Sequence, residues 1–255
     1  MNEYIFFLPF IAFIVLFLFI VFLGIRLRNK RKRELKELAL NNGFLYDENA
    51  DFLKQLNFIS LENLKTISID HINLGTEKKS GFFKFFPEYC DLEYTGLKIF
   101  TYGHSPRAEN LILVPFKSNR ILFFDYSYTT DGGKNSSTHS FTVALLKSKD
   151  QFPNFYLRPE NIIDKIVAFI GFDDIDISNY PEFSKKYYLK GDEQNSVMSF
   201  FTPERIMAFE QNQGWTIYSS RNYFLLYKKN THIPVKDYLT YIEEVKNLLN
   251  SLRIE

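Results

Sequence analysis

The stretch Tyr4–Ile25, YIFFLPFIAFIVLFLFIVFLGI, has no charged or amide side chain and consists mainly of Ile, Leu, Phe and Val. A helix of these residues would be about 33 Å long at ~1.5 Å per residue, enough to cross a hydrocarbon core of about 30 Å. Pro9 falls in the first turns, where its missing N–H costs little. A signal peptide would carry its charges before a shorter apolar stretch, and a soluble core helix would show a polar stripe. The sequence therefore predicts a transmembrane anchor with its basic collar over residues 1–33.

Immediately after this stretch comes a cluster of basic residues, whereas only Glu3 among the first three residues is charged. The cluster comprises Arg26, Arg28, Lys30, Arg31, Lys32 and Arg33. By the positive-inside rule, it predicts a single-pass protein of the cell membrane with the N-terminus outside and the C-terminal domain cytoplasmic. These side chains are also candidates for binding anionic lipid headgroups, at about 1 kcal/mol for each residue near the surface. The alternative is that the cluster acts only as a topology signal.

The composition excludes several classes of protein. A single Cys in 255 residues cannot close an intramolecular disulfide, which agrees with a reducing compartment. The 28 Phe and 16 Tyr, against 11 Gly and 9 Pro, predict a large buried core rather than a disordered chain. A net charge of +1 gives no reason to expect nucleic acid as a partner.

Residues 34–255 predict an α+β domain with an antiparallel sheet and several helices. Leu35, Leu38 and Ala39 share one face of a helix that continues from the anchor or bends away from it, with Gly43 as its stop. A second short helix is expected at Asp51–Leu56. Alternating and β-branched patterns predict strands at Ile67–Ile72, Leu97–Tyr102, Ile121–Tyr128, Ser140–Leu146 and Phe155–Leu157. The polar loop Thr130–Ser137 joins two of them as a hairpin.

The C-terminal third predicts mainly helices. One spans about 160–171, an irregular segment follows to about residue 191, and Asp192 begins a helix that ends near Phe201. Thr202 and Pro203 are typical of a helix start, and that helix should stop by Gly214. Trp215–Ser219 and Tyr223–Lys228 predict a hairpin, and an amphipathic helix between Val235 and Leu252 closes the chain. A subdivision of the domain near 159–180 is an open alternative.

No catalytic or metal-binding motif is complete. Gly132–Gly133–Lys134 lacks the earlier Gly and the following Ser or Thr of a P-loop. The acidic run at Asp173, Asp174 and Asp176 lacks the central Gly and closing Glu of a calcium loop, and is typical of an edge strand. His71, His104, His139 and His232 do not show metal-ligand spacing, and Cys90 has no basic neighbour. The sequence predicts no cofactor.

The segment GFFKFFPEY places four phenylalanines around Lys84. Exposed rings here would form a patch that dips into a membrane or binds a partner, and buried rings would be ordinary core. The short length between Gly81 and Pro87 favours Phe83 and Phe86 near the surface, as a candidate interaction patch.

Several blocks of the chain resemble a family of uncharacterised bacterial membrane-anchored proteins with one N-terminal transmembrane helix. The blocks are FDYSYTT, HSFTVALLKS, FPNFYLRPE, DIDISNYPEFSKKYYLKGDE and NYFLLYKK, within residues 34–250. The chain differs from the family pattern at Phe152, Ile177 and Tyr180, where Leu, Phe and His are usual. The resemblance implies the architecture and assigns no activity or functional residue.

These observations favour a membrane-tethered interaction or surface-binding domain without catalysis, whose partners are the lipid bilayer and another membrane or cytoplasmic protein. The alternative is a membrane-bound hydrolase or transferase whose site is assembled from residues distant in the sequence.

Overall fold

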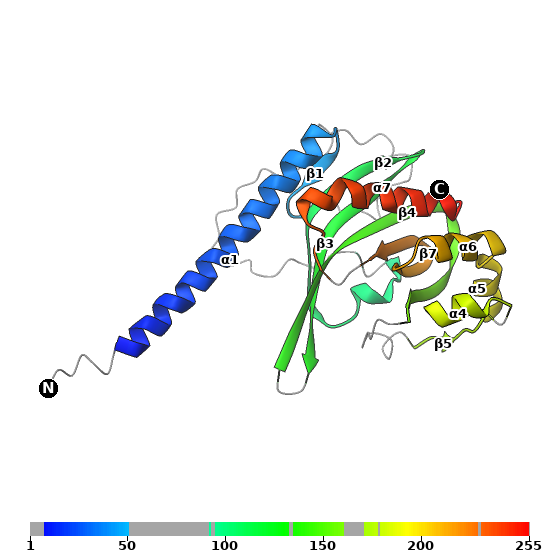
Figure 1. The fold of residues 1–255 in the computed structure, drawn as a ribbon, viewed down its shortest axis with the longest axis horizontal. Helices are drawn as coiled ribbons and strands as arrows, with labels where there is room; N and C mark the ends of the chain where they lie inside the picture. Colours follow the sequence, from blue (N-terminus) through cyan, green and yellow to red (C-terminus); the bar gives the residue numbers. More distant parts are fainter. Residues whose placement is uncertain are drawn as a thin grey trace.

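The computed structural model describes residues 8–50, 92, 95–132, 135–160, 171–177, 179–228 and 231–254. A long apolar helix precedes an antiparallel sheet and several further helices, which confirms the predicted α+β class (Figure 1). The elements are α1 (Leu8–Asn41), β1 (Leu45–Asp47), η5 (Lys98–Phe100), β2 (His104–Phe116), β3 (Asn119–Gly132), β4 (Asn135–Pro159), β5 (Asp173–Asp174), α4 (Pro181–Lys186), β6 (Tyr187–Gly191), α5 (Gln194–Phe200), α6 (Pro203–Gln211), β7 (Thr216–Tyr227), η6 (Val235–Asp237) and α7 (Tyr238–Ser251).

Helix α1 runs without interruption from the apolar stretch into the domain. It has 34 residues, so the segment after the basic cluster continues the helix of the apolar stretch rather than forming a separate helix. The most apolar 18-residue window in its described part has a mean hydropathy of 2.9 and no buried residue, so α1 is long and apolar enough to cross a membrane. Leu35 and Ala39 are fully buried while Leu40 is exposed, as the helical spacing predicts. The helix ends just before Gly43, whose φ of +69° suits a C-terminal stop.

The described strands form one seven-stranded antiparallel sheet in the order β1-β2-β3-β4-β6-β5, with β7 also paired to β4. Strands β3 and β4 make a long hairpin that runs in register from Ile121↔Leu146 to Gly132↔Asn135, which confirms the predicted hairpin. Most of the segment predicted as its loop, Thr130–Ser137, is paired strand instead, because the register holds as far as Gly132↔Asn135. Strand β4 continues beyond this hairpin to Pro159. It pairs with β7 between Ala144 and Leu157, and with β6 between Phe155 and Pro159. The two predicted strands Ser140–Leu146 and Phe155–Leu157 are therefore parts of a single strand.

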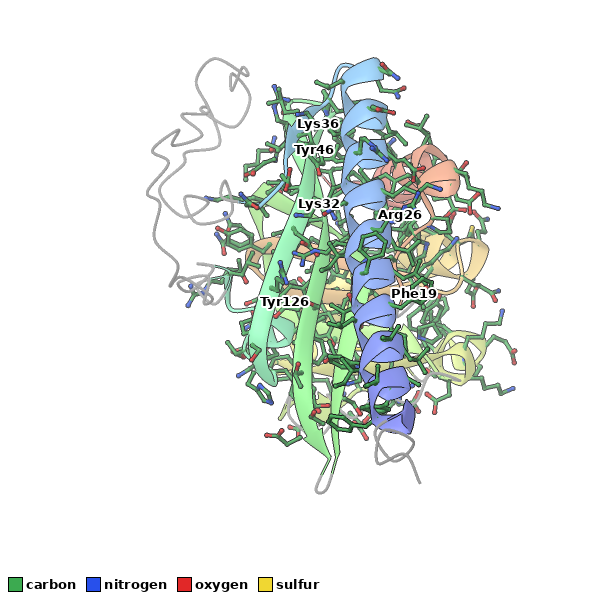
Figure 2. All side chains as sticks on the ribbon, turned by 90° about the vertical axis from the view of Figure 1, so that its left-hand side faces the viewer. Phe19, Arg26, Lys32, Lys36, Tyr46 and Tyr126 are labelled. Atoms are coloured by element: carbon green, nitrogen blue, oxygen red, sulfur yellow. The ribbon has the colours of Figure 1, made fainter. Side chains whose placement is uncertain are left out.

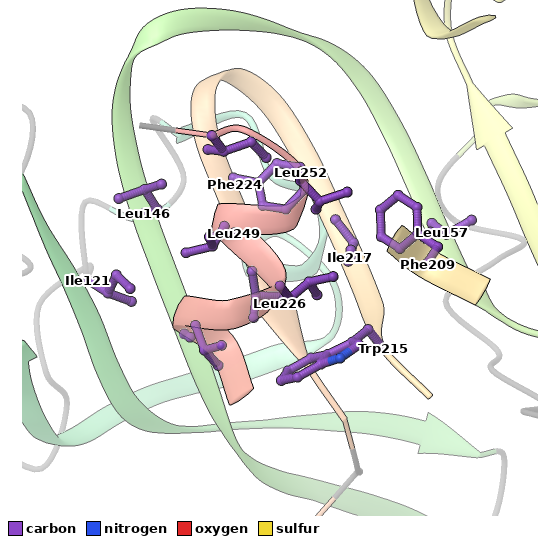
Figure 3. Packing of buried hydrophobic residues seen from close by; sticks show 14 of the residues in the cluster. Ile121, Leu146, Leu157, Phe209, Trp215, Ile217, Phe224, Leu226, Leu249 and Leu252 are labelled. Atoms are coloured by element: carbon purple, nitrogen blue, oxygen red, sulfur yellow. The ribbon is translucent and has the colours of Figure 1, made fainter. Parts of the chain in front are cut away.

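Alternation along the strands divides the core between the two faces of the sheet. Ile121 and Phe123 face the helices, whereas Leu122 and Phe124 belong to the core on the other face. On the helix side, α7 lies over the sheet, and its Leu249 packs with Phe224 and Leu226 of β7 (Figure 3). The opposite core is rich in aromatic rings, including Phe141, Tyr126 and Tyr227.

Two predictions of extended structure are wrong. Lys98–Phe100 is the 3-10 helix η5, because Gly96 and Gly103 on either side have φ of +75° and +76° and turn the chain. The predicted hairpin at 215–228 is the single strand β7, which pairs with β4 along both of its halves. Arg221, with φ of +56°, lies where the register shifts, so the turn-like residues there bend the strand without reversing it.

Strand β2 escaped prediction because Pro106 and Pro115 lie within it. The segment expected to be irregular contains α4 and β6. The helix start at Thr202 is confirmed, since the Thr202 hydroxyl accepts a hydrogen bond from the Arg205 amide at 3.4 Å, and so is the last helix, α7. The predictions at Asp51–Leu56, Ile67–Ile72 and 161–170 lie outside the described residues.

Candidate functional site: a polar cluster between helix α1 and the sheet

The basic residues of α1 lie on two opposite faces of the helix. Arg28, Arg31 and Lys32 are partly buried against the domain, on the same side as Leu35. Arg26, Lys30 and Arg33 are exposed and follow one another at i, i+4 and i+7, so they form a stripe on the outward face. Figure 2 shows Lys32 and Tyr46 on the side of α1 next to the strands, with Arg26 on the other side.

Arg31 reaches from α1 into the sheet and pairs with Asp125 of β3. Its Nε donates to Asp125 Oδ2 at 2.8 Å and its Nη2 to Oδ1 at 2.9 Å, a bidentate arrangement. The side chain of Asp125 is 2% exposed and that of Arg31 is 19% exposed. Alternation with Ile121 and Phe123 places Asp125 on the helix-facing side of the sheet, which is why a carboxylate there meets α1.

Two neutral side chains complete the shell around this carboxylate. Thr142 lies directly opposite Asp125 in the β3–β4 pair, and its hydroxyl donates to Asp125 Oδ1 at 2.7 Å. Asn110 of β2 donates through Nδ2 to Oδ2 at 2.9 Å. The Tyr46 hydroxyl lies 2.9 Å from Asn110 Oδ1 and 3.2 Å from the Lys32 carbonyl, which ties β1 to the helix. The buried charge is therefore both paired and hydrogen-bonded.

Burial alone would favour the protonated form of Asp125, but its contacts reverse that effect. Close contacts with His232 and with the Arg31 guanidinium hold the pKa of the Asp125 carboxyl well below its usual range. Burial, with a contribution from Asp125, raises the pKa of the Tyr238 phenol well above its usual value. The site thus combines a fixed anion with a neutral phenol.

A second row of ion pairs flanks this centre. Arg28 Nη2 lies 2.6 Å from Glu109 Oε2, and Lys32 Nζ lies 3.0 Å from Glu48 Oε1 and 3.8 Å from Glu109. These pairs are more exposed than Arg31–Asp125, so each adds less to stability. Together they show that half of the basic cluster contacts acidic side chains of the domain.

His232, in the segment before η6, joins the cluster from its open side. Its Nδ1 lies 3.0 Å from Asp125 Oδ1, and its Nε2 lies 2.7 Å from the hydroxyl of Ser140 on β4. The backbone of the next residue is also fixed, since Ile233 N donates to Thr142 Oγ1 at 3.1 Å and Ile233 O accepts from Arg31 Nη1 at 2.8 Å. Asp125, Ser140 and His232 are thus brought together from three segments of the chain.

The remaining sequence candidates lie elsewhere. His104 is exposed and pairs with Asp131, which lies next to the end of β3 where the β3–β4 hairpin turns, and His139 contacts Thr130. Asp173 and Asp174 form the edge strand β5, next to the buried Ile175.

Other candidates cannot be placed. Phe83, Phe86, His71 and Cys90 lie outside the described residues, as does Lys134 of the glycine loop. Within the described part of the chain, no group of three His, Cys, Asp or Glu side chains is arranged to hold a metal ion.

Sequence reasoning did not find Asp125, Ser140 or the role of Arg31. One signal was present, because Asp125 interrupts the apolar series of Ile121 and Phe123 at a position that alternation places in the core. A charge at such a position requires a buried partner. Which of the six basic residues supplies it depends on how α1 packs on the sheet, and the sequence does not contain that information.

The described chain thus combines one helix that is long and apolar enough to cross a membrane with an α+β unit docked on the extension of that helix. No protein-family model matches the chain, and no curated protein matches it. Among solved structures, the crystal structure of the mycobacterial trehalose monomycolate transport factor A, TtfA, is similar over 86% of this chain and 94% of that chain, with 12% identity and a TM-score of 0.47. A similarity at this level carries no argument about function.

Proposed function

We propose that this protein is a membrane-tethered domain that binds the anionic surface of the inner leaflet through the outward basic stripe of Arg26, Lys30 and Arg33. The observation that carries the proposal is the division of the basic cluster. Three of its residues contact carboxylates of the domain, while the stripe faces away from them. Within the described part of the chain, Lys30 pairs only with Glu34, at 3.6 Å and in an exposed position, which leaves it available to another anion.

The position of the stripe suits a headgroup layer. Arg26 directly follows the apolar stretch, and Arg33 lies eight residues beyond Ile25, or about 12 Å along a helix. Basic residues this close to a bilayer attract anionic lipids at about 1 kcal/mol each, an effect that is screened over about 8–10 Å by physiological salt. The proposal also places the C-terminal domain in the cytoplasm, following the positive-inside rule.

The test uses the full-length protein reconstituted in vesicles that contain phosphatidylglycerol and phosphatidylcholine. Spin-labelled forms of each lipid measure which one is enriched next to the protein. We expect enrichment of phosphatidylglycerol that weakens at high salt and is largely lost in the variant Arg26→Gln, Lys30→Gln, Arg33→Gln.

The matched control replaces two basic residues that contact carboxylates of the domain, Arg28→Gln with Lys32→Gln. This variant should keep the enrichment of phosphatidylglycerol. Equal loss in both variants would mean that total charge alone attracts the lipid, and would overturn the assignment to the stripe. Orientation is tested separately by a reporter fused after Glu255, which should be active only as a cytoplasmic fusion. Activity of a reporter that works outside the cell would contradict the proposed orientation.

A further inference from the structure

We propose that Ser140, His232 and Asp125 form a nucleophilic site that accepts an acyl group from a carboxylic ester. The three side chains lie in a line of acid, base and hydroxyl. Asp125 Oδ1 is 3.0 Å from His232 Nδ1, and His232 Nε2 is 2.7 Å from Ser140 Oγ. A serine activated by a histidine that a buried carboxylate orients is an arrangement that recurs on unrelated folds, so geometry defines it rather than sequence order.

The three members have the exposures that such a site needs. Asp125 is almost completely buried, whereas 37% of the His232 side chain is exposed and Ser140 is half-buried. The hydroxyl and the ring edge can therefore meet a substrate while the carboxylate stays out of water. The carboxylate remains ionised, because Arg31 and Thr142 hold it from other directions.

Asp125 is fixed by more groups than the orienting role requires. Arg31 donates two hydrogen bonds to it, and Thr142 and Asn110 donate one each. The His232 Nδ1–Oδ1 contact has hydrogen-bond length, but its angle is not that of a hydrogen bond. Bonds of this kind are often poorly aligned in free enzymes and tighten when substrate binds. Because Arg31 competes for the same carboxylate, we expect slow turnover and base the test on covalent labelling.

The reaction balances with the groups present and one water molecule. The Ser140 Oγ–H proton moves to His232 Nε2 as Oγ bonds to the carbonyl carbon of the ester. The carbon–oxygen bond to the alcohol then breaks, and His232 returns the proton to the leaving alkoxide. Water, deprotonated by His232, releases the acid from Ser140 and regenerates the hydroxyl.

The location of the site indicates which esters reach it. Arg31 contacts both Asp125 and the backbone next to His232, and it lies six residues beyond Ile25, about 9 Å along the helix. A substrate would therefore meet Ser140 close to the bilayer surface, which favours an amphipathic ester with its acyl chain in the membrane. This inference is independent of headgroup binding by the outward stripe.

The test treats full-length protein in a neutral detergent with a fluorophosphonate probe, which bonds covalently to activated serines. Mass spectrometry of the digested protein identifies the labelled residue. We expect label on Ser140, none in Ser140→Ala, and a labelling rate lowered by about 10²–10⁴-fold in His232→Gln. Ser127→Ala is the matched control, because Ser127 lies directly opposite Ser140 in the sheet and should leave labelling unchanged.

The outcomes are separable from a folding defect. The wild-type label is assigned to its residue directly, and the fluorescence of Trp215, the single Trp, reports whether each variant is folded. Absence of label on wild-type Ser140, or undiminished labelling in a folded His232→Gln protein, would overturn the proposal. Hydrolysis of p-nitrophenyl esters by the wild type and not by Ser140→Ala would extend the result from labelling to turnover.

Discussion

Arg31 and Asp125 are joined by two hydrogen bonds, of 2.8 and 2.9 Å, across 94 positions of sequence. The first lies in the helix that continues the apolar stretch, and the second lies in the third strand of the sheet. This pair fixes the sheet to α1 within the described structure. Anything that rotates or tilts this helix therefore also acts on the sheet through the pair.

Replacing Arg31 alone should be strongly destabilising. Arg31→Gln would leave the nearly buried Asp125 without its cation, and breaking a buried pair in this way costs about 3–5 kcal/mol. Arg33→Gln changes an exposed position of the same helix and should stay within about 0.5 kcal/mol. The measurement is urea unfolding of the detergent-solubilised protein, followed by Trp215 fluorescence. Similar losses in the two variants would mean that the pair does not hold the helix to the sheet.

Acid should weaken the protein partly through Asp125. Because contacts with His232 and Arg31 lower the pKa of this carboxyl in the folded state, its contribution to stability is complete above the unfolded-state pKa of about 3.9. That contribution is lost as the pH falls towards the lower folded-state pKa. The melting temperature should therefore fall more steeply between about pH 4 and pH 2 in the wild type than in Asp125→Asn. If the melting temperature fell equally steeply with pH in both proteins, Asp125 would be excluded as a source of the acid sensitivity.

Gly43 and Gly103 both have a positive φ, and substituting each by Ala tests how closely the chain packs around it. A Cβ at Gly103 would overlap the Thr129 carbonyl oxygen and lie 3.0 Å from the Tyr128 ring, whereas a Cβ at Gly43 meets nothing within 4 Å. Both substitutions by Ala meet the backbone penalty of about 1–2 kcal/mol, and Gly103→Ala adds an overpacking cost of about 1–3 kcal/mol. Denaturant unfolding should give a clearly lower free energy of unfolding for Gly103→Ala than for Gly43→Ala. The reverse order would contradict the close approach of the chain at Gly103.

The sequence predicted the elements whose signals are local. The helical form of the apolar stretch, the buried face of Leu35 and Ala39, and the Thr202 helix start each depend on neighbours within a few residues, and each is confirmed. The hairpin expected around Arg221 failed because the strand pairing that overrides a weak turn signal comes from β4, about 70 residues earlier. Local propensity carries no information about such a partner.

In the candidate site, too, the sequence predicted the local features and missed those that depend on distant segments. The basic cluster was visible in the sequence. Its separation into three residues that contact the domain and an outward stripe depends on the direction from which the sheet meets α1. Ser140 and His232 are separated by 92 positions and have no motif in common, so only the fold reveals their 2.7 Å contact. A site assembled from β3, β4 and the segment before η6 leaves no spacing that a sequence search detects.

The docking of α1 also determines where the apolar stretch can be removed from the chain. The sequence pattern predicts that the domain begins at residue 34, so a chain lacking residues 1–33 would follow that boundary. The structure shows that such a chain would lose Arg28, Arg31 and Lys32, leaving Asp125 without its cation and Glu109 without its closest partner. A chain starting at Arg26 keeps all three cations and discards the apolar stretch.

We therefore expect the chain starting at Arg26 to be soluble and to unfold cooperatively, and the chain starting at Glu34 to be less stable by at least the 3–5 kcal/mol estimated for the loss of Arg31. The measurement is denaturant unfolding of both chains by Trp215 fluorescence, with Asp125→Asn introduced into each. Since that change removes the uncompensated charge only from the shorter chain, it should narrow the difference between them. Equal stability of the two chains would mean that the sheet does not need the helix, and that the buried carboxylate finds another partner.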